Sequence, residues 1–117
     1  MNTNEISTKF EQAYQFLESA QDELYRPAED AVPYMVFKSV RNSISYYLMG
    51  FLLKNEIEFN EKDTEEVLLK KCQSINDKFN NFDLSPMIFT KDYAYGAEIN
   101  QMENCIVLAE YTKDLVD

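Results

Sequence analysis

The segment from Tyr34 to Asn55 constrains the fold most, because it reads as one long helix that is buried on more than one side. Apolar residues recur along it at the three- and four-residue steps of a helix, and others widen that stripe. The stripe is Phe37, Val40, Ile44, Tyr47 and Phe51, with Val36, Leu48 and Leu52 beside it. Pro33 suits the first turn, where its missing N–H would have no intrahelical partner. We therefore expect this helix to lie at the centre of a bundle.

The first helix is predicted from Glu5 to Tyr25, because apolar residues repeat there at alternating steps of four and three. This stripe consists of Ile6, Phe10, Ala13, Leu17, Ala20 and Leu24. A polar row on the other side, which is expected to face water, consists of Glu11, Gln15, Glu18 and Asp22. Pro27 ends the helix, since proline lacks an amide donor and restricts the residue before it.

Two more helices are predicted in the second half of the chain. Asp63 and Glu66 have the spacing of an N-cap and its third-position acid, so a third helix should begin there. Its apolar edge is predicted to comprise Leu68, Cys72, Ile75 and Phe79. The last helix should run from Ala97 to Leu115, with a stripe made of Ile99, Met102, Ile106 and Ala109 and with Cys105 and Leu108 beside it.

The connection from Asn80 to Tyr95 mixes polar turn residues with large aromatic rings, which indicates an ordered loop over the bundle. A short fifth helix is expected in it, after Pro86. Because 117 residues match one ordinary domain, residues 1–117 are predicted to form a single helical domain. The fold class is therefore all-α, an up-and-down antiparallel bundle of four main helices.

The balance of charges limits the classes of partner. With a formal charge of −10, a dedicated nucleic-acid surface is disfavoured, because such binding depends on cations that neutralise phosphates. The first ten residues show neither the basic start nor the apolar run of a secretory signal, which predicts a cytoplasmic location. The longest apolar run, from Tyr46 to Leu53, is too short to cross a bilayer, so no membrane association is expected.

Metal and cofactor sites are not predicted. Cys72 and Cys105 lie far apart without neighbouring ligands, so the spacing of a zinc knuckle or a redox CxxC is absent and two buried, reduced thiols are expected. The chain contains no histidine, which excludes the Glu-x-x-His pairs that hold metals in helical bundles. The aromatic residues Tyr14, Phe16, Tyr46, Tyr47 and Phe51 recur at helical spacing and are expected to serve in packing or at an interface.

Arg41 and Asn42 are the polar pair in the middle of the central helix. On a helical wheel Arg41 lies at the rim of the apolar stripe, from which a guanidinium can reach an acid on a facing helix or hold a phosphate. Four stretches, one of which contains this pair, follow one another in a characteristic order along the chain. They are AYQFLESAQDELYRPAED, VFKSVRNSISYYLMGFLLKN, DTEEVLLKKC and a final amphipathic helix. Together, over nearly the whole chain, they resemble the HEPN family, helical-bundle proteins named for higher eukaryotes and prokaryotes nucleotide-binding.

The resemblance implies a ribonuclease motif in which an arginine, often followed by a polar residue, precedes a histidine by four to six positions. Arg41 and Asn42 match its start, but Ser45, Tyr46 and Tyr47 stand where the histidine belongs. A phenol with a pKa near 10 is a poor general base at neutral pH. The family's catalytic histidine is thus missing, and the expected function is non-catalytic binding, either of a protein or of a nucleotide or RNA phosphate at Arg41.

Several partners and one rival function are compatible with the sequence. The excess of tyrosine favours a partner surface, and a homodimer is its simplest form. The resemblance implies a nucleotidyltransferase partner in a toxin–antitoxin type of system. The rival is a metal-independent ribonuclease of unorthodox chemistry, in which Arg41 and Tyr46 line a phosphate-binding cleft and an acid of the first helix acts as base.

Overall fold

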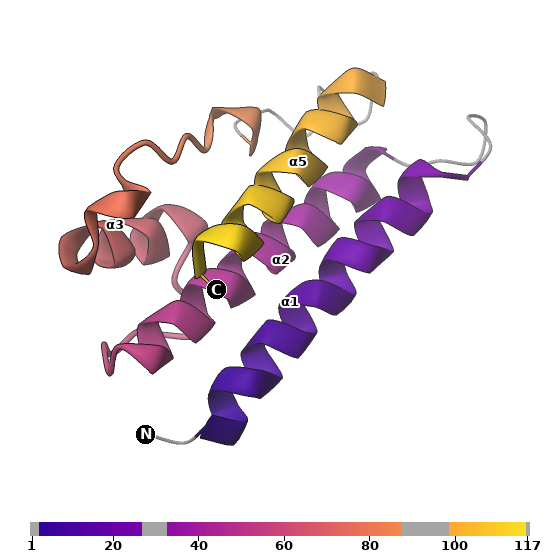
Figure 1. The fold of residues 1–117 in the computed structure, drawn as a ribbon. Coiled ribbons are helices and arrows are strands. Elements are labelled where there is room, and N and C mark those ends of the chain that lie inside the picture. Colours follow the sequence, from indigo (N-terminus) through magenta and orange to yellow (C-terminus); the bar gives the residue numbers. More distant parts are fainter. Residues whose placement is uncertain (1–2, 27–32, 88–98, 117) are drawn as a thin grey trace.

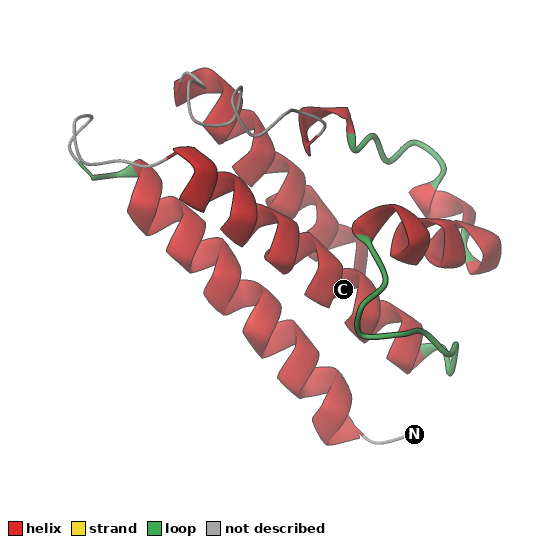
Figure 2. Cartoon of the chain, turned by 180° about the vertical axis from the view of Figure 1, so that it is seen from behind, coloured by secondary structure: helices red, strands yellow, loops and turns green. Residues whose placement is uncertain are grey.

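The computed structural model describes residues 3–26, 33–87 and 99–116, which contain only helices and their connections (Figures 1 and 2). The elements are α1 (Thr3–Leu24), α2 (Pro33–Lys54), α3 (Glu65–Ile75), the 3-10 turns η1 (Asp77–Phe79) and η2 (Ser85–Met87), and α5 (Ile99–Val116). The predicted all-α bundle of four main helices is confirmed, and α1 and α2 match their predicted bounds to within two residues. No helix in these ranges is both long enough and apolar enough to pass through a bilayer.

Helix α2 is the centre of the bundle, as its sequence predicted. It packs against α1, α3 and α5, and residues along its whole length are buried. Figure 1 shows α1 antiparallel to α2 on one side, the shorter α3 on the other, and α5 running in the same direction as α2. Because α2 has a neighbour on three sides, apolar residues can occupy most of its circumference.

Small residues allow α1 and α2 to lie close together. Ala13 and Ala20 of α1 and Ser43 of α2 are fully buried, and Gly50 follows Ser43 after seven residues. The Ser43 hydroxyl donates a hydrogen bond of 2.8 Å to the backbone carbonyl of Ala13, so one polar contact joins the two helices in the core. A Cβ atom added at Gly50 would lie 2.4 Å from a ring carbon of Phe10, which shows that this ring fills the space over the glycine.

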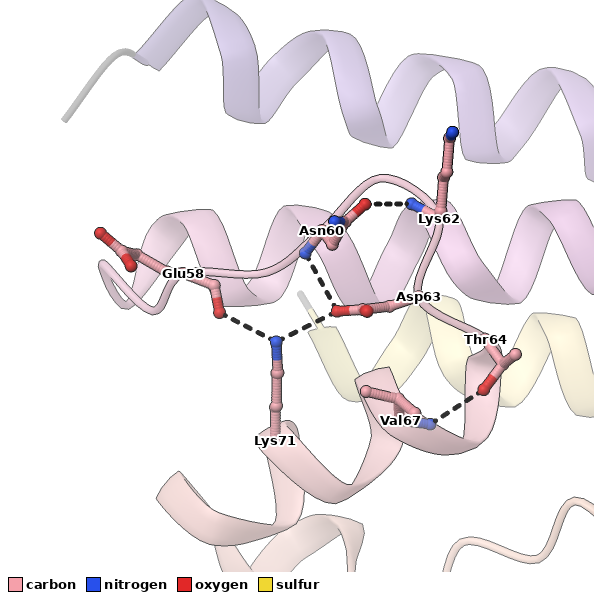
Figure 3. Close-up of polar contacts among 7 residues, drawn as sticks. All are labelled: Glu58, Asn60, Lys62, Asp63, Thr64, Val67 and Lys71. Atoms are coloured by element: carbon pink, nitrogen blue, oxygen red, sulfur yellow. Dashed lines mark hydrogen bonds and ion pairs between the residues drawn. The ribbon is translucent and has the colours of Figure 1, made fainter.

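Helix α3 has its N-cap one residue later than predicted. The cap is Thr64, whose hydroxyl accepts a hydrogen bond from the Val67 N–H, and not Asp63 (Figure 3). Val67 therefore stands in the third helical position, and Glu66 cannot complete a capping box. The prediction was wrong because the loop itself uses the Asp63 carboxylate, which accepts hydrogen bonds from the Asn60 N–H at 3.0 Å and from Lys71 Nζ at 3.1 Å.

These contacts also affect the ionisation of Asp63. The Asn60 N–H, followed by Lys71, lowers the pKa of the Asp63 carboxyl below its usual value. Lys71 Nζ also donates to the Glu58 carbonyl at 3.2 Å, so one ammonium group ties α3 to two points of the loop that precedes it (Figure 3).

Helix α3 also ends earlier than predicted, at Ile75 instead of Phe79. Asn76 takes an extended conformation, and its side-chain oxygen accepts from the Lys78 N–H, which starts η1. Asparagine interrupts helices in this way because its side chain competes for backbone groups. Phe79 is still fully buried through η1, whereas Ile75, which was predicted on the apolar edge, is 38% exposed.

The C-terminus of α2 closes with a Schellman motif. The Ile57 N–H bonds to the Leu52 carbonyl at 2.9 Å, and the Glu56 N–H bonds to the Leu53 carbonyl at 3.1 Å. Glu56 has a φ of 59°, the left-handed conformation that this motif requires and that glycine adopts most readily. Ile57 then packs against the core.

Part of the long connection before α5 is described. The 3-10 turn η2 includes Pro86 and buries Met87, and the residues beyond Met87, where the short helix after Pro86 was expected, lie outside the described residues. The remaining predictions for residues 88–98, including the start of the last helix at Ala97, lie outside the described residues. In α5 the predicted buried positions are confirmed for Met102, Cys105, Ile106, Leu108 and Ala109.

Replacing Gly50 tests the close contact of α1 and α2. We expect Gly50→Ala to lower the free energy of unfolding by about 1–2 kcal/mol, because displacing the Phe10 ring outweighs the gain of about 1 kcal/mol in helix propensity. Urea denaturation measures the change. In a Phe10→Leu background the same substitution should cost less, and an equal cost in both backgrounds would contradict the assigned contact.

Replacing Glu56 tests the helix end. Glu56→Gly should raise the free energy of unfolding by about 0.5–1 kcal/mol, since it removes the penalty of a left-handed side-chain-bearing residue. Glu58→Gly, two residues along the same loop, is the control. It should lower stability, because Glu58 does not have a positive φ and glycine adds freedom to the unfolded chain. Thermal unfolding followed by circular dichroism gives both signs.

Candidate functional site

Arg41 lies where α2 meets the N-terminus of α3. Its Nε is 3.0 Å from Oε1 of Glu65, the first residue of α3. The Glu65 side chain is only 11% exposed, whereas that of Arg41 is 46% exposed. A carboxylate in the first helical turn is also stabilised by the partial positive charge at that end of the helix. The arginine is thus paired with an acid of a facing helix, one of the two outcomes expected from its rim position.

The same arginine reaches the connection before α5. Arg41 Nη2 is 3.4 Å from the Met87 carbonyl in η2, a long contact that adds a third segment to the cluster. Next to it, Cys105 of α5 has its Sγ 3.1 Å from the Pro86 carbonyl. Burial raises the pKa of the Cys105 thiol to about 12, and the positive charge of Arg41 opposes that rise.

The other thiol is similarly placed. Cys72 of α3 is fully buried, its Sγ lies 3.9 Å from the Leu48 carbonyl, and burial raises its pKa to about 12. Both cysteines are free and buried, as predicted. Thiols with raised pKa values are weak nucleophiles and metal ligands at neutral pH. In the described part of the chain, no three residues of the metal-binding types form a cluster that could hold an ion.

Tyr46 is not part of the Arg41 cluster. Its ring stacks on Phe16 of α1, with centroids 5.4 Å apart and an interplanar angle of 5°, and Lys9 Nζ lies 4.9 Å from its centroid. Arg41 instead contacts α3 and η2, because five residues correspond to a rotation of about 140° around a helix. Asn42, between these two faces, is partly buried. The structure therefore does not bring the candidate residues Arg41 and Tyr46 together.

The packing role predicted for the aromatic residues holds for Tyr47 and Phe51, which are buried, and for Phe16 and Tyr46, which stack on one another. Tyr14 differs, because it is 45% exposed. It lies in a groove between α1 and α5 with a volume of about 400 Å³. The groove is lined by Phe10, Glu11, Tyr14, Gln15, Glu18, Tyr47 and Lys113.

Sequence reasoning missed this groove. The polar row with Glu11 and Glu18 is exposed, as predicted, but the sequence pattern does not show that the row borders a hollow in the surface. The available signal was Tyr14, an aromatic residue three positions after one acid and four before the other. Lys113 of α5 carries no such signal. Its Nζ lies 5.1 Å from the centroid of the Tyr14 ring.

Neutralising Glu65 tests the central ion pair. We expect Glu65→Gln to lower the free energy of unfolding by about 1–2 kcal/mol, because Arg41 loses its charged acceptor at a largely buried carboxylate. Glu66→Gln is a matched control at the next, exposed position, which feels the same helix terminus. Chemical denaturation should show little change for the control. Equal losses for the two variants would assign the effect to the helix terminus instead of the pair.

Comparison with known proteins adds no family to this geometry. No model of a protein family, no curated protein and no solved structure matches this chain. The function must therefore be argued from the arrangement of the residues themselves.

Proposed function

We propose that this chain is a cytoplasmic, non-catalytic, HEPN-like helical domain that acts by binding another protein. The observation that carries the proposal is the pairing of Arg41 with Glu65 at 3.0 Å. In the expected motif this arginine would be the group that holds a phosphate. Here its charge already serves to join α2 to α3.

A phosphate at Arg41 would have to compete with the Glu65 carboxylate. That carboxylate is 11% exposed, so losing its partner would leave a charge in a poorly hydrated place. Breaking such a pair is costly when one partner stays behind. The incoming phosphate would also be repelled by the carboxylate itself at close range. Both effects favour the structural role of the pair over phosphate binding.

The overall charge supports the same choice. A chain with a formal charge of −10 repels RNA at long range, and the repulsion is strongest at low salt. The same charge attracts basic protein surfaces and raises their rate of association. A protein partner is therefore favoured over a polyanion.

Phosphate binding at Arg41 is the second candidate, favoured by the 46% exposure of its side chain. The proposal has three finer forms, which are a homodimer, a nucleotidyltransferase partner and membership in a toxin–antitoxin system. Sedimentation of the purified chain would test the homodimer, and co-expression with a nucleotidyltransferase would test the other two forms.

A ribonuclease and binding assay tests the proposal. Purified wild-type protein and Arg41→Ala should both leave a short single-stranded RNA intact in the presence of a chelator, and neither should bind a fluorescent nucleotide saturably at low salt. Glu65→Gln, which releases the guanidinium from its carboxylate, is the informative third protein. Nucleotide binding that appears only in this variant would support competition between the Glu65 carboxylate and a phosphate for Arg41. Cleavage by wild type that Arg41→Ala lacks would refute a non-catalytic domain.

A further inference from the structure

We infer that the groove between α1 and α5 binds a cationic amphipathic helix of a partner protein. The inference rests on the proposed protein-binding function and names the class of its partner. The groove is built from two helices that each pack against α2, with Tyr47 of α2 and Phe10 of α1 among its lining residues. It lies apart from the Arg41 cluster, because none of its lining residues belongs to that cluster.

The lining offers an apolar surface for an anchor side chain. Phe10 and Tyr47 have ring centroids 6.3 Å apart, and Tyr14 adds a third ring that is 45% exposed. Tyrosine suits such a surface, since its ring buries apolar area while its hydroxyl tolerates water. The volume of about 400 Å³ falls within the range of pockets that hold ligands, roughly 300–1,000 Å³. One large apolar side chain of a partner helix would thus find a place to insert.

The charges along the groove select the partner's chemistry. Glu11 and Glu18 both line it, both are exposed, and they are seven residues apart. On a helix that separation is two turns, about 10.5 Å. A partner helix that lies along α1 and carries Lys or Arg at positions i and i+7 would place one cation beside each acid. Asp22, also exposed, continues the acidic row by one further turn.

Lys113 is the one basic residue of the lining, and its ammonium is engaged over the face of the Tyr14 ring, 5.1 Å from the centroid. This cation–π contact joins Lys113 of α5 to Tyr14 of α1. A second copy of the chain is a poorer occupant, because two-fold docking of this surface would set acidic rows of two strongly negative molecules against each other. Charge complementarity therefore favours a basic partner.

A synthetic peptide tests the inference. The probe is a four-turn helix with a leucine stripe and one tryptophan. Along each side of the stripe it carries a pair of lysines that are seven residues apart. Because the protein has no tryptophan, fluorescence reports the peptide alone. We expect saturable binding by wild type, and at least about tenfold weaker binding by the Glu11→Lys/Glu18→Lys double variant. A peptide with glutamates in place of lysines should not bind.

The matched control is Glu58→Lys/Glu66→Lys, which makes the same change in net charge at exposed positions outside the groove. It should bind the lysine peptide within about twofold of wild type. Equal weakening of the two double variants would reduce the effect to net charge and overturn the inference, as would the absence of saturable binding. A wild-type dimer that Tyr14→Arg dissociates would assign the groove to a second copy. Arg41-dependent RNA cleavage would refute the proposed function alone, since Arg41 is not part of the groove.

Discussion

The close approach of α1 and α2 is the constraint on which the rest of the molecule depends. Two helices can come this near only where side chains are small, and here Ala13 of α1 lies at Ser43 of α2, while Gly50 of α2 leaves the space that the Phe10 ring fills. Once α1 covers one side of α2, two other sides are available for α3 and α5. The hydrogen bond from Ser43 to the Ala13 carbonyl uses a second lone pair of an oxygen inside α1, so a buried hydroxyl is satisfied without interrupting the helix.

The Arg41–Glu65 pair performs a different task in the same bundle. It joins α2 to the start of α3 at a place where one partner is nearly buried and the other half exposed. Such a pair often contributes no more stability than apolar packing of the same size, but removing one partner leaves the other charge unpaired and is costly. An arginine that sequence alone associates with ligand binding can thus be retained for the geometry of the fold.

The helices were predictable because their apolar residues repeat with a helical period, and α2 was placed at the centre because its stripe is unusually wide. The helix ends were less predictable. Asp63 and Thr64 are both suitable N-cap residues. Only the contacts with Asn60 and Lys71 show that the Asp63 carboxylate is used within the loop and that Thr64 is the cap. The periodicity of α3 continues to Phe79, although Asn76 breaks the helix and a 3-10 turn returns the ring to the core. A periodic pattern does not distinguish these two routes.

The sequence indicated which residues belong to the candidate site, but not which residues contact one another there. Arg41 was correctly placed at a rim, whereas its partner Glu65 comes from a helix whose position depends on tertiary packing. Tyr46 is close to Arg41 in sequence and yet contacts a different helix. The groove depends on how far apart α1 and α5 lie over α2, a distance that the order of residues does not reveal.

The packing of Phe10 over Gly50 also bears on how α1 and α2 choose their alignment. Leu17 and Ala20 repeat the spacing of Phe10 and Ala13 one heptad later, so sliding α1 by seven residues would present a similar pair to Ser43 and Gly50. Any backbone carbonyl can accept the serine hydroxyl, and the hydrogen bond alone therefore does not discriminate between the two alignments. The difference in size between phenylalanine and leucine does discriminate between the two alignments, because the phenylalanine ring fills the space over Gly50. The Phe10 ring therefore fixes the alignment of α1 on α2. A chain without this ring would lose the unique pairing of the two helices before it lost the helices themselves.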